Sequence, residues 1–155
     1  MKSPSRLLWV AVTVASIVLG SGCSSFRRDL KASRQRDIPH DSVEGLWVGD
    51  WSSVRNPDHG GRMEMVLTRT GDTLYRASTR SHWWRLFRSS YDTTIVVTPI
   101  HPGGYLILGE KNLWGFGGYT LTGRVDSAAI DAGFRVGSNE GRIRLGRPAE
   151  DGERQ

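Results

Sequence analysis

The chain has 155 residues, a single cysteine and a formal net charge of +5 at neutral pH. One cysteine excludes a disulfide within the chain, so stability has to come from a buried core. The excess of basic residues is small, and part of it lies near the N-terminus, which argues against a nucleic-acid partner. The length predicts one domain with an additional segment.

Residues 1–22 have the layout of a secretory signal sequence. Lys2 and Arg6 form a basic start, residues 7–19 carry no charge, and residues 20–22 are small. A membrane-spanning helix, the alternative, needs roughly 20 apolar residues, and the uncharged run is too short for one. We therefore predict a signal peptide that is cleaved after Gly22.

Cys23 follows these small residues directly, in the sequence "LGSGC". This stretch resembles the lipobox of bacterial lipoproteins, in which the cysteine receives a diacylglyceryl group and becomes the mature N-terminus. Gly20 departs from the branched apolar residue that the family usually has there. The resemblance implies a lipid anchor at Cys23, and the alternative is a signal peptide without lipidation. The residue after the cysteine is Ser24 and not aspartate, which resembles the default signal for sorting lipoproteins to the outer membrane. This resemblance implies an outer-membrane location facing the periplasm.

Residues 24–43 contain few apolar side chains and no strand pattern. Together with Cys23 they predict a flexible basic tether over residues 23–43. Its basic side chains would lie close to the membrane, where anionic head groups could bind them, although a solvated spacer is an equal alternative. These side chains are Arg27, Arg28, Lys31, Arg34 and Arg36.

Residues 44–148 consist of short alternating runs separated by turn residues, which is typical of strands. The expected strands are 46–52, 62–68, 74–79, 92–98, 105–108, 113–125, 129–136 and 141–148, with a hairpin turn over 69–73. No sustained helical spacing separates them. We therefore predict an all-β fold, an antiparallel meander of about seven or eight strands closed into a small barrel. Such a barrel encloses side chains or one small ligand. Residues 149–155 are predicted to be a disordered tail.

The stretch "SHWWRLF" covers residues 81–87. Residues 83–90 fit either an extended segment or a short helix capped by Ser81, and their aromatic residues and the run on to Tyr91 favour the extended form. Alternation then places large apolar groups on both faces, so one face has to meet solvent, a partner or lipid. Exposed aromatic clusters often mark interaction sites. The candidate interaction surface consists of Trp83, Trp84, Arg85 and Phe87, unless the tether or a loop covers it.

The first strand carries the sequence "EGLWVGDW", in which Gly45 and Trp47 share a face with Gly49 and Trp51. This stretch resembles the Gly-x-Trp opening of lipocalins and the wider calycin group. The resemblance implies that Trp47 closes the barrel floor beneath an arginine of the last strand, for which Arg142 and Arg144 are the candidates. An arginine over an indole contributes roughly 0.5–2 kcal/mol. The Thr-Asp-Tyr motif of lipocalins is absent, and the domain is shorter than a typical lipocalin.

Three stretches, "GLWVGDWSS", "TRTGDTLYRA" and "IRLGRP", are also similar to a group of uncharacterised bacterial envelope lipoproteins. That resemblance covers most of the mature chain and implies no activity.

The sequence contains no pattern that predicts catalysis or a cofactor. The four histidines, His40, His59, His82 and His101, are scattered without a second ligand at metal-binding spacing. No serine or free cysteine stands in a recognisable nucleophile pattern. The leading hypothesis is a non-enzymatic, membrane-anchored barrel that binds an apolar ligand or an envelope partner. The alternatives are a filled barrel with a structural role and, third, an enzyme with an unrecognised site.

Overall fold

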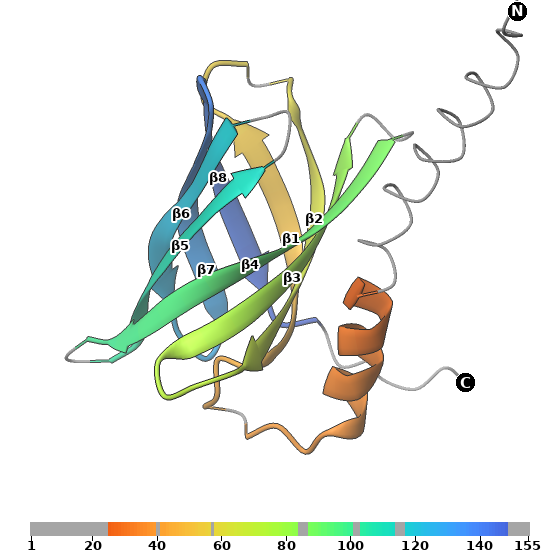
Figure 1. Ribbon diagram of the computed structural model, residues 1–155, viewed down its shortest axis with the longest axis vertical. Helices are drawn as coiled ribbons and strands as arrows, with labels where there is room; N and C mark the ends of the chain where they lie inside the picture. The colour runs from red at the N-terminus through yellow and green to blue at the C-terminus, as the bar shows by residue number, and fades with distance from the viewer. Residues whose placement is uncertain are drawn as a thin grey trace, which may run out of the picture.

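The computed structural model describes residues 25–39, 41–56, 58–83, 87–100, 103–113 and 117–148. The strands are β1 (Gly45–Ser53), β2 (Gly60–Arg69), β3 (Leu74–Trp83), β4 (Phe87–Pro99), β5 (Tyr105–Leu113), β6 (Gly117–Val125), β7 (Ala129–Val136) and β8 (Asn139–Gly146). Each strand pairs antiparallel with the next, and β8 returns to β1, so these eight strands close into a barrel (Figure 1). The predicted all-β barrel is therefore confirmed.

Alternation along each strand separates the barrel interior from its surface. On β1, Trp47 and Trp51 are buried while Asp50 is exposed. Gly49, which lies between the two tryptophans, allows β1 to approach β8 closely, because a Cβ there would lie 2.1 Å from the Arg144 carbonyl oxygen. The alternation of small and large residues on β1 thus follows from the tight curvature of a small barrel.

The end of the barrel where β1 begins and β8 ends is covered by side chains, and we call it the closed end. Trp47 is fully buried there and donates a hydrogen bond from Nε1 to the Val43 carbonyl oxygen at 3.0 Å. The Arg147 guanidinium lies over the Trp47 ring, 3.7 Å from the ring centroid. Arg147 also donates to the Glu44 carbonyl oxygen at 2.7 Å and to the Ser42 carbonyl oxygen.

The arginine over Trp47 is therefore Arg147, and the prediction of Arg142 or Arg144 was wrong. Alternation on β8 points Ile143 and Leu145 into the barrel, so Arg142 and Arg144 project from the outer surface. Arg147 lies just beyond the end of β8, where strand alternation no longer fixes the direction of its side chain.

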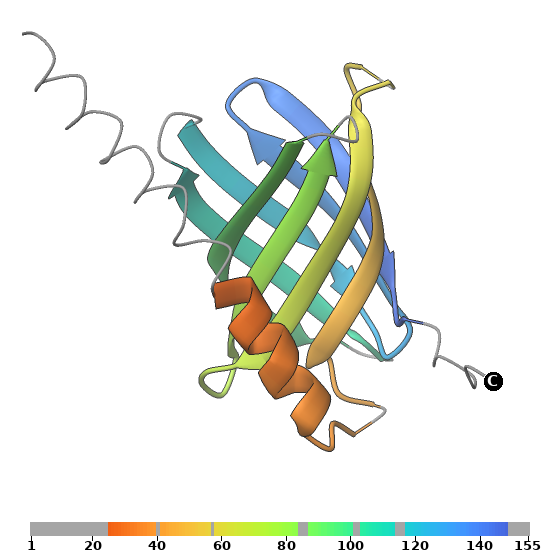
Figure 2. The same ribbon diagram turned by 90° about the vertical axis from the view of Figure 1, so that its right-hand side faces the viewer.

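Residues 25–35 form a helix, in the segment that we predicted to be a flexible tether. The helix lies against the outside of the barrel (Figure 2), with Phe26 and Asp29 buried. Asp29 accepts hydrogen bonds from Ser78 Oγ at 2.5 Å and Arg76 Nη2 at 2.9 Å, both on β3. The prediction failed because this helix is held by one aromatic residue and a buried carboxylate, so it has no broad apolar stripe. No helix in the described residues is long and apolar enough to cross a membrane.

Candidate functional site

The wall of the barrel is discontinuous between β4 and β5. Their pairing runs only from Pro99↔Tyr105 to Ile95↔Gly109. Beyond that point β4 pairs with β3 alone, and β5 pairs with β6 alone. The β3–β4 and β5–β6 hairpins therefore diverge, as Figure 2 shows. We call this opening, between residues 87–94 of β4 and 110–113 of β5, the seam.

The residues at the last β4–β5 pair explain why the wall opens there. A Cβ on Gly109 would lie 2.7 Å from Ile95 Cγ2, so the two strands are already in close contact at this point. The next inward position on β5, after Ile107 and Gly109, belongs to Lys111, whose side chain is exposed. A lysine ammonium is rarely buried without a partner, so a closed wall at this position would be costly.

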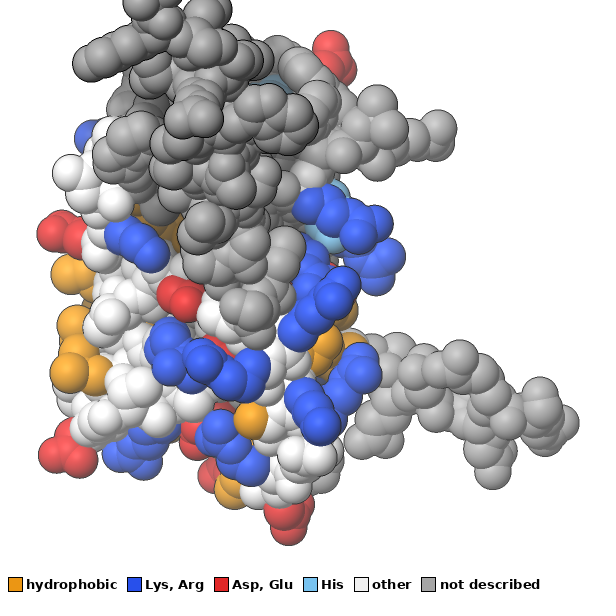
Figure 3. Space-filling model, turned by 45° about the vertical axis from the view of Figure 1, so that its right-hand side comes forward, with side chains coloured by type: hydrophobic (Ala, Val, Ile, Leu, Met, Phe, Trp, Pro, Cys, Tyr) orange, Lys and Arg blue, Asp and Glu red, His pale blue; other side chains and the backbone are white. Residues whose placement is uncertain are grey.

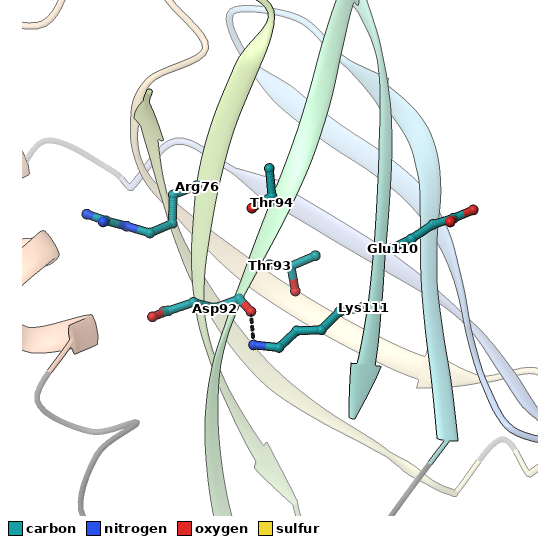
Figure 4. Close-up of a pocket in the computed structure, with 6 residues that line it drawn as sticks. All are labelled: Arg76, Asp92, Thr93, Thr94, Glu110 and Lys111. Atoms are coloured by element: carbon teal, nitrogen blue, oxygen red, sulfur yellow. Dashed lines mark hydrogen bonds between the residues drawn. The ribbon is translucent and has the colours of Figure 1, made fainter. Parts of the chain in front are cut away.

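A cleft of about 330 Å³ lies at the seam (Figure 4). The Lys111 ammonium reaches across it and donates a hydrogen bond to the Asp92 carbonyl oxygen. Figure 4 shows Arg76 and Glu110 pointing away from the opening on opposite sides, with Thr93 between β4 and β5. The lining residues are Arg76, Asp92, Thr93, Thr94, Glu110 and Lys111.

The half of the interior beside the seam is rich in hydroxyl groups, which we call the hydroxyl layer: Thr79, Ser81, Ser89, Tyr91, Thr93 and Tyr119. Ser81 Oγ and Ser89 Oγ lie 2.6 Å apart. The Tyr91 and Tyr119 rings meet edge to face with their centroids 5.5 Å apart. Burial raises the pKa of both tyrosines, and a hydrogen bond to Tyr91 raises the pKa of Tyr119 further.

Thr93 has a buried hydroxyl group that is available to a molecule entering the cleft. Its side chain is 3% exposed, and Oγ1 has no hydrogen-bond partner among the described residues. Leaving such a hydroxyl unsatisfied costs about 1–3 kcal/mol. Because Thr93 lines the cleft, a bound molecule that offers a donor or an acceptor there would recover that cost.

The seam also presents two strand edges. In antiparallel sheets the backbone N–H and C=O of alternate residues point toward the same neighbouring strand. The Asp92 carbonyl points into the seam, where Lys111 reaches it, so the backbone groups of Ser90 and Thr94 face the seam as well. On β5, Glu110 and Asn112 continue the alternation of Leu108, which pairs with Val96. Among the described residues, no register pair joins these positions across the seam.

The sequence-predicted residues lie at several different places. Gly45 and Trp47 meet at the closed end, where Arg147 Nη1 lies 3.2 Å from the position of a Cβ on Gly45. Trp83 and Phe87 pair at the tip of the β3–β4 hairpin, at the outer end of the seam. Their side chains lie outside the described residues, as do Gly22, Cys23, Trp84, Arg85 and the tail at 149–155.

The seam itself was missed by the sequence-based predictions. Its signals were a lysine at an inward position after Ile107 and Gly109, and hydroxyl residues at inward positions of β3 and β4. No group of three or more histidine, cysteine, aspartate or glutamate residues in the described ranges could hold a metal ion. No protein-family model, curated protein or solved structure matches this chain.

Proposed function

We propose that this chain is a non-catalytic binding module of the bacterial cell envelope that receives an extended segment of a partner protein at the seam. The observation that carries the proposal is the loss of β4–β5 pairing beyond Ile95 and Gly109. A lipid on Cys23 would hold the barrel at the periplasmic side of the outer membrane.

Strand addition suits the geometry of the seam. An extended peptide can pair its backbone with a free strand edge, while pockets along the edge recognise its side chains. The edge of β4 offers the backbone groups of Ser90, Asp92 and Thr94, and Thr93 offers a buried hydroxyl beside them. Lys111 covers the Asp92 carbonyl in the free protein. Lysines and inward-pointing charges commonly protect strand edges from unwanted pairing, so Lys111 would have to move when the correct segment binds.

An apolar ligand is the second candidate that we considered from the sequence, and the described residues favour it less. The cleft at the seam is lined by charged and hydroxyl side chains. The closed end is filled by buried side chains, with Trp47 at 0% exposure among them. Native mass spectrometry of the protein extracted from membranes tests this candidate directly. A bound lipid-sized mass at high occupancy would support the apolar ligand over the polypeptide.

The strand-addition proposal is tested by a photo-crosslinking amino acid placed at Thr94 in the full chain in cells. We expect an adduct with a partner protein, and no such adduct from the same group at Thr122, which is exposed on the continuous wall of β6. Asp92→Pro removes the seam-facing amide without affecting the pairing of β4 with β3. Asp92→Ala removes the same side chain and keeps the amide.

Strand addition predicts that the Thr94 adduct disappears with Asp92→Pro and persists with Asp92→Ala. Equal adducts in both variants, or no adduct at Thr94, would contradict it, and the second result would favour a purely structural barrel. Membrane attachment has a separate test. The unchanged chain should incorporate a labelled fatty acid and Cys23→Ala should not, and equal labelling of the two, or no labelling of either, would refute the lipid anchor.

A further inference from the structure

The helix at residues 25–35 carries its acidic side chain and its basic side chains on different faces. Asp29 is the only acidic residue in this range, and it is 4% exposed, against the barrel. The basic side chains are on the exposed side, and no carboxylate of the helix accompanies them. These exposed residues are Arg27, Arg28, Lys31 and Arg34.

The helix is held in one orientation on the barrel, so its basic face is presented as a fixed surface. Asp29 binds Arg76 and Ser78, and the Arg80 guanidinium lies 4.0 Å from the centre of the Phe26 ring. Rotation of the helix would break these contacts and bury arginine side chains. Basic side chains are prominent on the face of the molecule that Figure 3 shows.

The contacts beneath the helix do not neutralise its outer face. Asp29 compensates Arg76, and Glu64 Oε2 lies 3.4 Å from Arg80 Nη1. The acidic residues that follow in the sequence, Asp37 and Asp41, come after the helix has ended. Among the described residues, the only carboxylate that pairs with this outer face is Asp29, which lies 3.4 Å from Arg28, so the face keeps most of its positive charge.

We propose that this basic face binds the anionic head groups of a lipid bilayer and thereby sets the orientation of the barrel on the membrane. Guanidinium groups bind phosphate oxygens through paired hydrogen bonds, and a row of them along a helix fits a surface of head groups. The helix begins two positions after Cys23, which a lipid anchor would place at the bilayer surface. Binding through the helix does not require the lipid or the seam, so it can be tested independently of both.

The test is co-flotation of the full chain with vesicles of phosphatidylcholine alone or of phosphatidylcholine and phosphatidylglycerol in equal amounts. Residues 1–24 are common to all variants, so their own membrane affinity cancels when variants are compared. The helix variant carries Arg27→Gln, Arg28→Gln, Lys31→Gln and Arg34→Gln. The matched control removes the same charge from exposed positions on the barrel, with Arg124→Gln, Arg135→Gln, Arg142→Gln and Arg144→Gln.

Each basic residue close to an anionic surface strengthens binding about fivefold, so the helix variant should lose at least about tenfold of the preference for anionic vesicles. The barrel control should stay within about twofold of the unchanged chain, and added salt should abolish the preference. Thermal melting of both variants checks that the barrel remains folded. Equal losses in the two variants, or no loss in the helix variant, would overturn the proposal.

Discussion

The closed end and the seam side of the same barrel have opposite interiors. At the closed end the inward positions are apolar, and Arg147 joins Trp47 to the backbone at Ser42 and Glu44. Beside the seam the inward positions carry the hydroxyl layer, and no register pair in the described residues joins positions 87–94 of β4 to β5. Both halves follow the same strand alternation. β3 and β4 stay paired through their hydroxyl residues, so the wall opens only on the β5 side, where Lys111 follows Ile107 and Gly109.

The largest expected effect comes from the closed end. Trp47→Ala should lower the free energy of unfolding by about 3–5 kcal/mol, because it leaves a large cavity beneath Arg147. Chemical denaturation measures this directly. A loss below about 1 kcal/mol would mean that Trp47 does not hold the closed end together.

A smaller loss of stability is expected when Arg147, which covers Trp47, is replaced. Almost no loss is expected when an arginine on the barrel surface is replaced. Arg147→Met should cost about 2 kcal/mol, because it removes the contact with the indole ring and the hydrogen bonds to backbone carbonyl groups. Arg144→Met is the matched control, because Arg144 is 69% exposed and its ion pair among the described residues, with Asp131, spans 4.0 Å. This change should stay within about 0.5 kcal/mol. Equal losses in the two variants would contradict the role of Arg147.

The smallest effect, and one of opposite sign, is expected in the hydroxyl layer. Thr93→Val replaces a buried hydroxyl without a partner by a methyl group of similar size, and should stabilise the barrel by up to about 1 kcal/mol. Thr79→Val removes a hydroxyl that hydrogen-bonds to Tyr91, and should destabilise it by about 1 kcal/mol. The two midpoints of unfolding, compared in the same denaturant, give the sign. Destabilisation by Thr93→Val would show that its hydroxyl is already satisfied.

The parts of the fold that were predictable from the sequence depend on local patterns. Alternation alone placed β7 at residues 129–136 and put Trp47 on the inner face of β1. The hairpin turn at 69–73 follows from its glycine and aspartate, and Thr70 and Gly71 donate backbone hydrogen bonds to Leu74 there. These features need no knowledge of what lies across the barrel.

The parts that were not predictable depend on contacts between distant segments. Arg147 acts at the closed end because its guanidinium lies over Trp47, which belongs to β1 and is distant in the sequence. The helix forms because Asp29 accepts hydrogen bonds from Arg76 and Ser78 on β3. The composition of residues 24–43 does not indicate these contacts. The seam depends on where β4–β5 pairing stops, and only the register of the folded barrel defines that point.

The central claim is that β4 presents an open edge at the seam, and residue-resolved amide hydrogen exchange of the free protein tests it most directly. The amides of Ser90, Asp92 and Thr94 should exchange at least about a hundredfold faster than those of Val96 and Thr98. All of these amides point to the same side of β4, but only Val96 and Thr98 have register partners on β5. Equal protection along the whole strand would mean that the wall is closed, and would contradict the proposed binding site.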